Sequence, residues 1–163
     1  IEKEGATTLW ERWEFLNNDK CFNSHSHPFA GSVDVYFYKI LAGLGLDEEV
    51  SGFKKIILKP IMSGDLPYAS ASVNTIRGKV VSAWERNDEE LRYKVEVPGN
   101  TTAELYIPKN AWDKIEITEG TKSCWNGENA VDVEGMTYLR EEEKYVVYQI
   151  EAGSYEFKVA PVK

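Results

Sequence analysis

Apolar residues repeat with helical spacing over about four turns that follow Pro28. The spacing is close to 3.6 residues, and the apolar positions are Phe29, Val33, Tyr36, Phe37, Ile40, Leu41 and Leu44. Pro28 suits the first position of a helix, because its missing N–H has no intrahelical partner there. Gly43 and Gly45 can supply the left-handed backbone with which many helices end. The pattern therefore predicts one helix that begins near residue 29 and ends near Gly43.

After residue 51 the pattern changes from helical spacing to short apolar runs and alternation. A first run, Ile56-Ile57-Leu58, precedes Pro60. Later runs place apolar residues at every second position, which is typical of strands with one buried face. These runs are Tyr68–Val73, Leu91–Val97, Ala103–Ile107, Ile115–Ile117, Val146–Ile150 and Tyr155–Val159. Each of them predicts a β-strand.

Turn-forming residues separate these runs at intervals of about ten residues. The turns are Arg77-Gly78, Asn87-Asp88, Pro98-Gly99-Asn100, Glu119-Gly120, Asn126-Gly127 and Ala152-Gly153. Short strands with such turns indicate an antiparallel β-sandwich. The expected fold class is therefore mainly β, with one or two helices ahead of the sandwich. We expect a domain boundary that separates helical residues 1–50 from sandwich residues 51–163.

Composition and charge narrow the class of partner. The chain has 163 residues, of which 42% are apolar and 12% aromatic, so it can build a core. A net charge of −8 argues against a nucleic-acid partner, because phosphate binding depends on an excess of lysine and arginine. Neutral sugars are compatible with an acidic protein. No apolar run approaches the roughly 18 residues of a membrane span, so no membrane partner is expected.

The chain start and the cysteines add two expectations. The first residues, Ile1-Glu2-Lys3-Glu4, include neither an initiator methionine nor a signal peptide, which predicts a fragment of a longer protein. Cys21 and Cys124 have no second cysteine or histidine at metal spacing, so we interpret them as ordinary reduced thiols. They leave the compartment open, with a periplasmic or extracellular location favoured over a cytoplasmic one.

The stretch Thr7-Thr8-Leu9-Trp10-Glu11-Arg12-Trp13-Glu14 concentrates side chains that could carry chemistry. Thr8 and Glu11 have the spacing of a helix capping box, which would give Glu11 a purely structural role. Trp10 and Trp13 would flank Glu11 on nearly the same helix face. Indole rings beside a carboxylate suit a sugar, because the apolar C–H face of a pyranose stacks on an aromatic ring while its hydroxyls need polar partners. The stretch is therefore a candidate sugar site.

Two histidines follow in Ser24-His25-Ser26-His27-Pro28. A metal site needs more than two such ligands, and no cysteine or suitably spaced carboxylate completes a shell, so we expect neither a metal nor another cofactor. A histidine just ahead of a helix could also simply bond loop carbonyls. From the residues alone, both a structural role and a functional role stay open for His27.

The sandwich residues predict packing more than chemistry. Trp84, Trp112 and Trp125 could form a sugar-binding platform, but single tryptophans on strands more often pack in the core, which is what we expect here. The acidic run Glu141-Glu142-Glu143-Lys144 predicts a solvated turn between two strands.

Five segments occur in the order in which they are found in the bacterial α-L-rhamnosidases of glycoside hydrolase family 78. The segments are Gly5–Trp13, Ser26–Val33, Leu41–Leu44, Gly52–Pro60 and Gly99–Pro108. The chain resembles the C-terminal end of such an enzyme. On this resemblance, residues 1–50 are the last helices of an incomplete α/α-barrel catalytic domain, and residues 51–163 are the C-terminal β-sandwich that follows it.

The resemblance also implies roles for particular residues. The general base of the family, the glutamate of its Thr-Thr-x-Trp-Glu-Arg-Trp motif, falls on Glu11, and its sugar-contacting histidine falls on His27. Trp10 and Trp13 would bind the same sugar. The implied reaction is the release of terminal α-L-rhamnose, with inversion, from rhamnosides or polysaccharides.

The implied reaction has a consequence for the isolated chain. An inverting enzyme needs two carboxyl groups roughly 6.5–9.5 Å apart, and the acid would come from the upstream catalytic barrel of the parent chain. We therefore expect the 163-residue piece to be inactive by itself. The alternative is a non-catalytic carbohydrate-binding or structural β-sandwich module, in which Glu11 only caps a helix.

Overall fold

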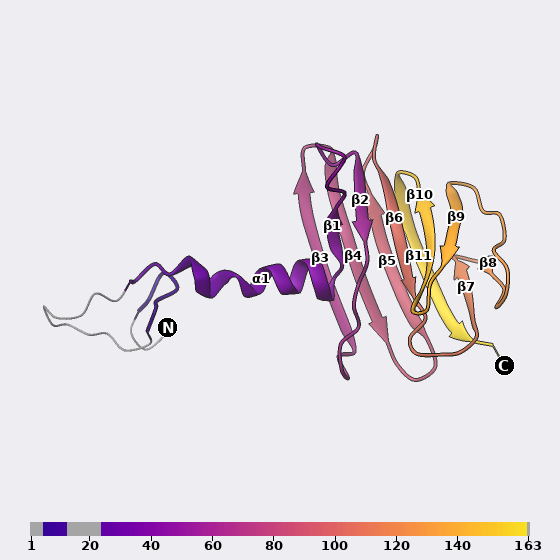
Figure 1. Cartoon of the computed structure of the whole chain (residues 1–163), viewed down its shortest axis with the longest axis horizontal. Coiled ribbons are helices and arrows are strands. Elements are labelled where there is room, and N and C mark those ends of the chain that lie inside the picture. Colours follow the sequence, from indigo (N-terminus) through magenta and orange to yellow (C-terminus); the bar gives the residue numbers. More distant parts are fainter. Residues whose placement is uncertain (1–4, 13–23, 163) are drawn as a thin grey trace, which may run out of the picture. The chain divides into compact units, whose positions relative to one another are not determined.

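The structure, a computed structural model, describes residues 5–12 and 24–162 (Figure 1). The chain divides into two compact units, residues 1–36 and residues 37–163, each of which is described by itself. The second unit contains the strands. The domain boundary expected between residues 50 and 51 stays a prediction.

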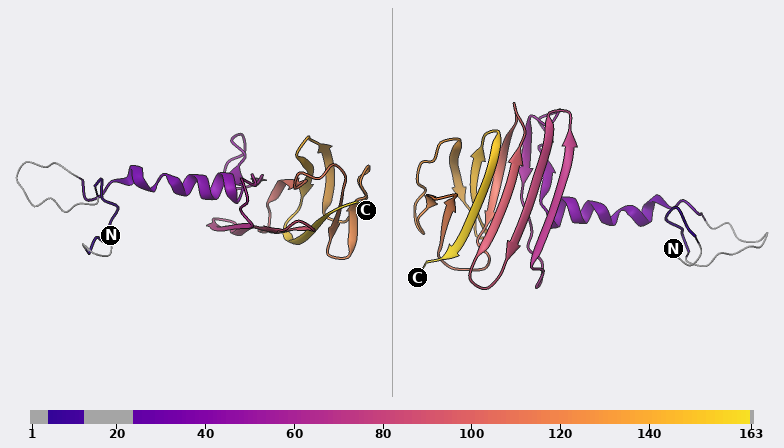
Figure 2. Two further views of the ribbon diagram at one scale, coloured as in Figure 1. Left: turned by 90° about the horizontal axis from the view of Figure 1, so that it is seen from below. Right: turned by 180° about the vertical axis from the view of Figure 1, so that it is seen from behind.

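The strands form two sheets that lie in two layers (Figures 1 and 2). One sheet has the order β1-β2-β6-β10-β9 and the other β3-β4-β5-β11-β7-β8. Neighbouring strands are antiparallel except for β2 and β6, which are parallel. The strands are β1 (Leu44–Leu46), β2 (Lys55–Leu58), β3 (Tyr68–Thr75), β4 (Gly78–Arg86), β5 (Leu91–Val97), β6 (Thr102–Pro108), β7 (Ile115–Glu119), β8 (Lys122–Trp125), β9 (Met136–Glu141), β10 (Tyr145–Ile150) and β11 (Gly153–Pro161). The mainly-β sandwich that the alternation predicted is confirmed.

The core lies between the two sheets and follows the alternation of each strand. In β5, Leu91, Tyr93 and Val95 are completely buried, whereas Arg92 and Lys94 between them are exposed. Strand β11 repeats this pattern, and the facing sheet contributes buried residues of β6 and β10 to the same cluster. Burying one such side chain stabilises the fold by about 1.5–3 kcal/mol. The alternating positions therefore hold the two layers together.

A helical run precedes the first strand, as the apolar stripe predicted. It consists of a 3₁₀ turn at Pro28–Gly31, α1 at Val33–Val35 and a π-helical segment at Tyr36–Leu41. Gly43 has a φ of +73°, and a Cβ at this position would lie 2.1 Å from the backbone nitrogen of Pro60. Conformation and space therefore both require glycine where the helix has ended. Leu44 and Gly45, which the sequence pattern placed in the helix and its stop, lie instead in β1, where they pair with β2.

Hydrogen bonds join the end of the helical run to β4. The indole N–H of Trp84 donates to the carbonyl of Leu41 at 2.7 Å, and the buried hydroxyl of Ser82 donates to the carbonyl of Ala42. The Ser82 hydroxyl also lies 3.1 Å from the hydroxyl of Tyr93. These bonds give partners to polar groups inside the core, where an unpaired group is costly.

Candidate active-site residues

The two segments that carry the candidate site residues pair with each other along the backbone. The N–H of Glu11 donates to the carbonyl of Ser24 at 2.9 Å, and the N–H of His27 donates to the carbonyl of Leu9 at 2.7 Å. The Thr8 hydroxyl also donates to a carbonyl of the second segment, that of His25. The pairing brings Trp10 and Glu11 beside residues that lie well over ten positions further along the chain.

The Glu11 carboxylate belongs to this pairing and not to a helix cap. Its Oε2 accepts a hydrogen bond from the backbone N–H of Ser24 at 3.0 Å, and the residue is exposed. Described residues 5–12 contain no helix, and the Thr8 hydroxyl is bonded elsewhere. The capping-box interpretation of Thr8 and Glu11 is therefore wrong in this structure. The bond from Ser24 orients the carboxylate while leaving it accessible to solvent.

The aromatic residues around Glu11 form ring contacts. The Trp10 and His25 rings stack at a centroid distance of 4.4 Å and an interplanar angle of 17°. The ring of His27 lies 6.4 Å from that of Phe29 and is tilted by 57°. His25, to which the sequence assigned no functional role, thus contacts one of the expected sugar-binding residues. Its alternation with His27 was the only signal that could have indicated this.

Local sequence explains the position of His27. It directly precedes Pro28, which begins the 3₁₀ turn, and its carbonyl accepts the N–H of Ala30 at 3.1 Å. The residue is half-buried, held by backbone bonds on both sides. Trp13, the fourth expected site residue, lies outside the described residues, as does Cys21.

Within residues 5–12 and 24–162, no group of three or more histidine, cysteine, aspartate or glutamate side chains is arranged to hold a metal ion. None of the helices in these ranges combines the length and the apolar character that crossing a membrane requires.

Two of the three sandwich tryptophans are buried in the core, as expected, and the third is partly buried. Trp84 and Trp125 are 2% and 3% exposed, and Trp112 packs against the same cluster. Neither buried ring can present a face to a sugar. The acidic run that begins at Glu141 forms the turn between β9 and β10, as predicted, although Glu142 is not merely solvated because it pairs with a neighbouring arginine.

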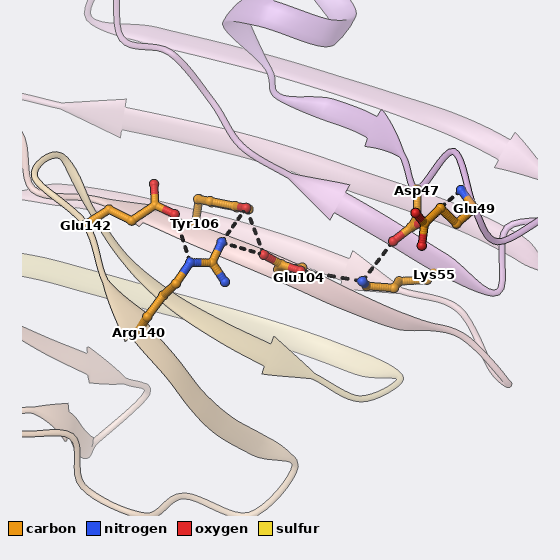
Figure 3. A network of polar contacts seen from close by, with 7 residues as sticks. All are labelled: Asp47, Glu49, Lys55, Glu104, Tyr106, Arg140 and Glu142. Carbon is orange, nitrogen blue, oxygen red and sulfur yellow. Dashed lines mark hydrogen bonds and ion pairs between the residues drawn. The ribbon is translucent and has the colours of Figure 1, made fainter.

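A row of charged residues crosses the outer face of the sheet that contains β6 (Figure 3). The ammonium group of Lys55 lies 2.8 Å from Asp47 and 3.5 Å from Glu104. The guanidinium of Arg140 donates to Glu104 at 2.8 Å, and the Tyr106 hydroxyl donates to the same carboxylate oxygen at 2.8 Å. These contacts link the β1–β2 loop to β2, β6 and β9.

Contacts within the row shift the pKa values of its members. Burial by itself raises the pKa of Glu104, but hydrogen bonds from Tyr106 and Arg140 outweigh it, so the pKa lies below its ordinary value. The hydrogen bond between Lys55 and Asp47 lowers the pKa of the aspartate and raises that of the lysine. Glu104, Asp47 and Lys55 are therefore charged near neutral pH. Each charge has a partner inside the row, which indicates a structural role.

Two family models match successive parts of the chain. Residues 45–122 match the bacterial alpha-L-rhamnosidase C-terminal domain, and residues 2–41 match the bacterial alpha-L-rhamnosidase 6 hairpin glycosidase domain. An alpha-L-rhamnosidase of Formosa agariphila is 31% identical over 160 residues, which are 95% of this chain and 16% of that protein. One of Streptomyces avermitilis is 29% identical over 161 residues, which are 96% of this chain and 14% of that protein.

Solved structures give the same result. The alpha-L-rhamnosidase from Dictyoglumus thermophilum superposes with a TM-score of 0.80 at 38% identity, over 98% of this chain and 17% of that one. The Streptomyces avermitilis enzyme, solved as a complex with L-rhamnose, gives a TM-score of 0.68 at 28% identity, over 99% of this chain and 14% of that one. The chain thus spans less than one fifth of the length of these relatives.

A β-sandwich that follows a segment of a six-hairpin domain defines the C-terminal part of a glycoside hydrolase. The chain belongs to the bacterial α-L-rhamnosidases of glycoside hydrolase family 78 and matches the C-terminal part of these enzymes. The family resemblance of the sequence segments is confirmed.

Proposed function

We propose that the parent enzyme releases terminal α-L-rhamnose with inversion and that Glu11 is its general base. The observation that carries the proposal is the Glu11 carboxylate. It is exposed, it is oriented by the backbone N–H of Ser24, and it lies in the segment that matches the glycosidase domain. An accessible carboxylate of fixed orientation is what activation of a water molecule requires.

The chemistry needs one further carboxyl group from the rest of the parent enzyme. In an inverting mechanism a carboxylic acid protonates the leaving oxygen, while a carboxylate takes a proton from water on the opposite face of the sugar. The water oxygen then bonds to the anomeric carbon as the glycosidic bond breaks. Since a carboxylate can accept at both oxygens, Glu11 can hold Ser24 with Oε2 and still receive the water proton.

The neighbours of Glu11 would bind the sugar. Trp10 has one ring face against His25, so a pyranose would contact its edge or its other face. His27, which the backbone holds firmly, would donate to or accept from a sugar hydroxyl. Trp13 stays a predicted sugar contact. These roles rest on the family match and on the pairing of the two segments.

The test is Glu11→Gln in the complete parent enzyme. Glutamine keeps an oxygen that can accept the Ser24 N–H, but it cannot take a proton, so kcat should fall by about 10²–10⁴ with little change in rhamnose binding. Thr8→Val is the matched control, because it removes a bond between the same two segments and leaves the carboxylate. We expect Thr8→Val to retain most of the turnover.

A second measurement separates a base from a residue that only positions the loop. Added formate or azide should restore part of the activity of Glu11→Ala, because a small anion can replace the missing carboxylate at the water. A Glu11→Gln enzyme with near-normal turnover would show that Glu11 serves only to hold Ser24.

A further inference from the structure

The outer face of the sheet that contains β3, β4, β5 and β11 carries a hollow. The right panel of Figure 2 shows these strands side by side and facing the viewer. Their register aligns Ser70, Ala83, Lys94 and Glu156 across neighbouring strands, and the N–H of Gly120 bonds to the carbonyl of Glu156. Because Ser70, Ala83 and Gly120 have small side chains or none, the surface is concave there. The hollow measures about 570 Å³, within the roughly 300–1,000 Å³ of ligand sites.

The adjacent register row forms one wall of the hollow. It aligns Tyr68, Glu85, Arg92 and Lys158. Tyr68 is 67% exposed, which is unusual for a large ring, and it lines the hollow. Arg92 and Lys158 are both paired with Glu90, at 2.7 Å and 2.5 Å. The ion pairs hold these donors and acceptors in place, so a ligand would meet an ordered polar wall beside an aromatic ring.

The hollow continues into two more at the end of the sheet. They measure about 410 Å³ and about 380 Å³. The second shares Tyr68, Glu85 and Arg92 with the first, and the third shares Pro67, Arg86 and Asn87 with the second. Trp112 lines the third hollow. We call the three adjoining hollows together the sheet groove; Tyr68 lines the first two of them and Trp112 lines the third.

The charge of the sheet groove excludes a polyanion as its preferred ligand. Its basic residues are Arg86, Arg92, Lys94 and Lys158, and its acidic residues are Asp65, Glu85, Asp88, Glu90 and Glu156. The two sets nearly cancel, so the groove offers no excess of positive charge to phosphates or carboxylates. It offers paired charges, amides and aromatic rings, the groups that bind hydroxyls and C–H faces of uncharged sugars.

We propose that the sheet groove binds an uncharged, rhamnose-bearing oligosaccharide, several sugars of which occupy its successive hollows. The choice of rhamnose rests on the proposed function of the parent enzyme, whereas the sugar-binding chemistry rests on the groove. Rhamnose is a 6-deoxyhexose, so its methyl group adds an apolar surface that suits Ala83 and the ring of Tyr68. The sandwich would thereby hold the polysaccharide from which the enzyme releases rhamnose.

Binding of a neutral rhamnan hexasaccharide to the 163-residue chain, measured by calorimetry, tests the proposal. Tyr68→Ala removes the exposed ring, and Ala83→Gln fills the hollow from the outer face, so neither change reaches the core. Asn74→Ala is the matched control, because Asn74 is exposed on the same face of β3 but does not line the groove. Thermal unfolding of each variant verifies that the sandwich is folded.

The wild-type chain should bind the hexasaccharide, and Tyr68→Ala and Ala83→Gln should each weaken binding by about tenfold or more, or about 1.4 kcal/mol. Asn74→Ala and Glu11→Ala should bind like wild type. The proposal is overturned if the wild-type chain does not bind at millimolar sugar, if hexagalacturonate binds as tightly, or if Asn74→Ala loses as much affinity as Tyr68→Ala.

Hydrolysis of nitrophenyl α-L-rhamnoside by the complete enzyme separates this proposal from the proposed function. That substrate carries one sugar and should be hydrolysed equally well by the Tyr68→Ala enzyme, whereas Glu11→Gln should lower its kcat by about 10²–10⁴. If Glu11→Gln loses turnover but the wild-type chain does not bind the oligosaccharide, only the proposal for the sheet groove is overturned. If the wild-type chain binds the oligosaccharide and Glu11→Gln has normal turnover, only the assignment of Glu11 as the base is overturned.

Discussion

Glu104 should contribute more to the stability of the sandwich than any surface ion pair of ordinary strength. Its side chain is only 14% exposed, and it accepts two hydrogen bonds of 2.8 Å, from Tyr106 and Arg140. Hydrogen bonds to a charged group contribute about 1.5–3 kcal/mol each, against about 0.5–1.5 kcal/mol for neutral ones. Glu104→Gln keeps the shape and one acceptor but removes the charge, so each bond should weaken by about 1 kcal/mol.

The expected total for Glu104→Gln is therefore about 2 kcal/mol. Lys55, at 3.5 Å and partly exposed, adds only a few tenths of a kcal/mol because Asp47 still neutralises it. In a protein of this size, 1 kcal/mol shifts Tm by about 2–4 °C, so we expect Tm to fall by about 4–8 °C near neutral pH. Calorimetry or circular dichroism can measure the shift.

The pH dependence provides a sharper test of the same reasoning. The pKa of Glu104 is lowered from an ordinary value of 4.5, so its contribution is fully present above that pH and is lost as pH falls through the lower pKa of the folded state. The difference in Tm between wild type and Glu104→Gln should shrink accordingly in acid. Glu128→Gln is the control, because its exposed pair with Lys114 should not change Tm measurably. Equal Tm values for Glu104→Gln and wild type, or a difference that persists unchanged in acid, would refute the reasoning.

Four further predictions follow from the two units. The purified 163-residue chain should not hydrolyse nitrophenyl α-L-rhamnoside above a Glu11→Ala control, because the proposed mechanism takes its acid from the rest of the parent enzyme. Turnover above that control would contradict this. Deletion of residues 1–28 should leave a cooperative thermal transition, since the compact sandwich unit begins later, and its loss would show that the chain folds as one domain. Gly43→Ala should lower the free energy of unfolding, measured with urea, by about 3 kcal/mol, because a Cβ would collide with Pro60. An unchanged free energy of unfolding would mean that the backbone adjusts freely. Burial raises the pKa of Cys124 to about 12, so peptide mass spectrometry should find it unalkylated by iodoacetamide at neutral pH until the protein is unfolded; alkylation of the folded chain would show that the sheets open locally.

The strands that sequence alone could predict are those whose inward positions are all apolar. In β5 and β11 the alternation is strict, so pattern and structure agree. Strand β4 was not predicted as a separate element, because Ser82 occupies an inward position and is tolerated only through its bonds to Ala42 and Tyr93. Strand β9 is almost wholly exposed at the edge of its sheet, so nothing in its pattern marked a buried face. Inward polar residues and exposed edges depend on partners that are distant in the sequence.

Prediction of the candidate site from sequence was limited in the same way, by contacts with distant residues. Residue types and family resemblance selected Glu11, His27 and Trp10, but local spacing assigned Glu11 to a helix cap that the structure does not contain. The backbone pairing with Ser24 replaces that cap, and no local pattern could indicate it because the partner is thirteen residues away. The stacking of Trp10 on His25 has the same origin.

The parallel pairing of β2 with β6 has a consequence for the order in which the sandwich folds. Lys55 in β2 pairs with Thr102 in β6, whereas β3, β4 and β5 pair with their immediate neighbours in the chain. Closing a long loop costs chain entropy before any contact repays it, so local hairpins form sooner than distant pairs. During synthesis, the edge of β2 that will pair with β6 therefore stays unpaired while the meander β3-β4-β5 is made and folds. The residues that connect the glycosidase segment to the sandwich are thus among the last to be fixed in place, although they are made before the strands of the sandwich that hold them.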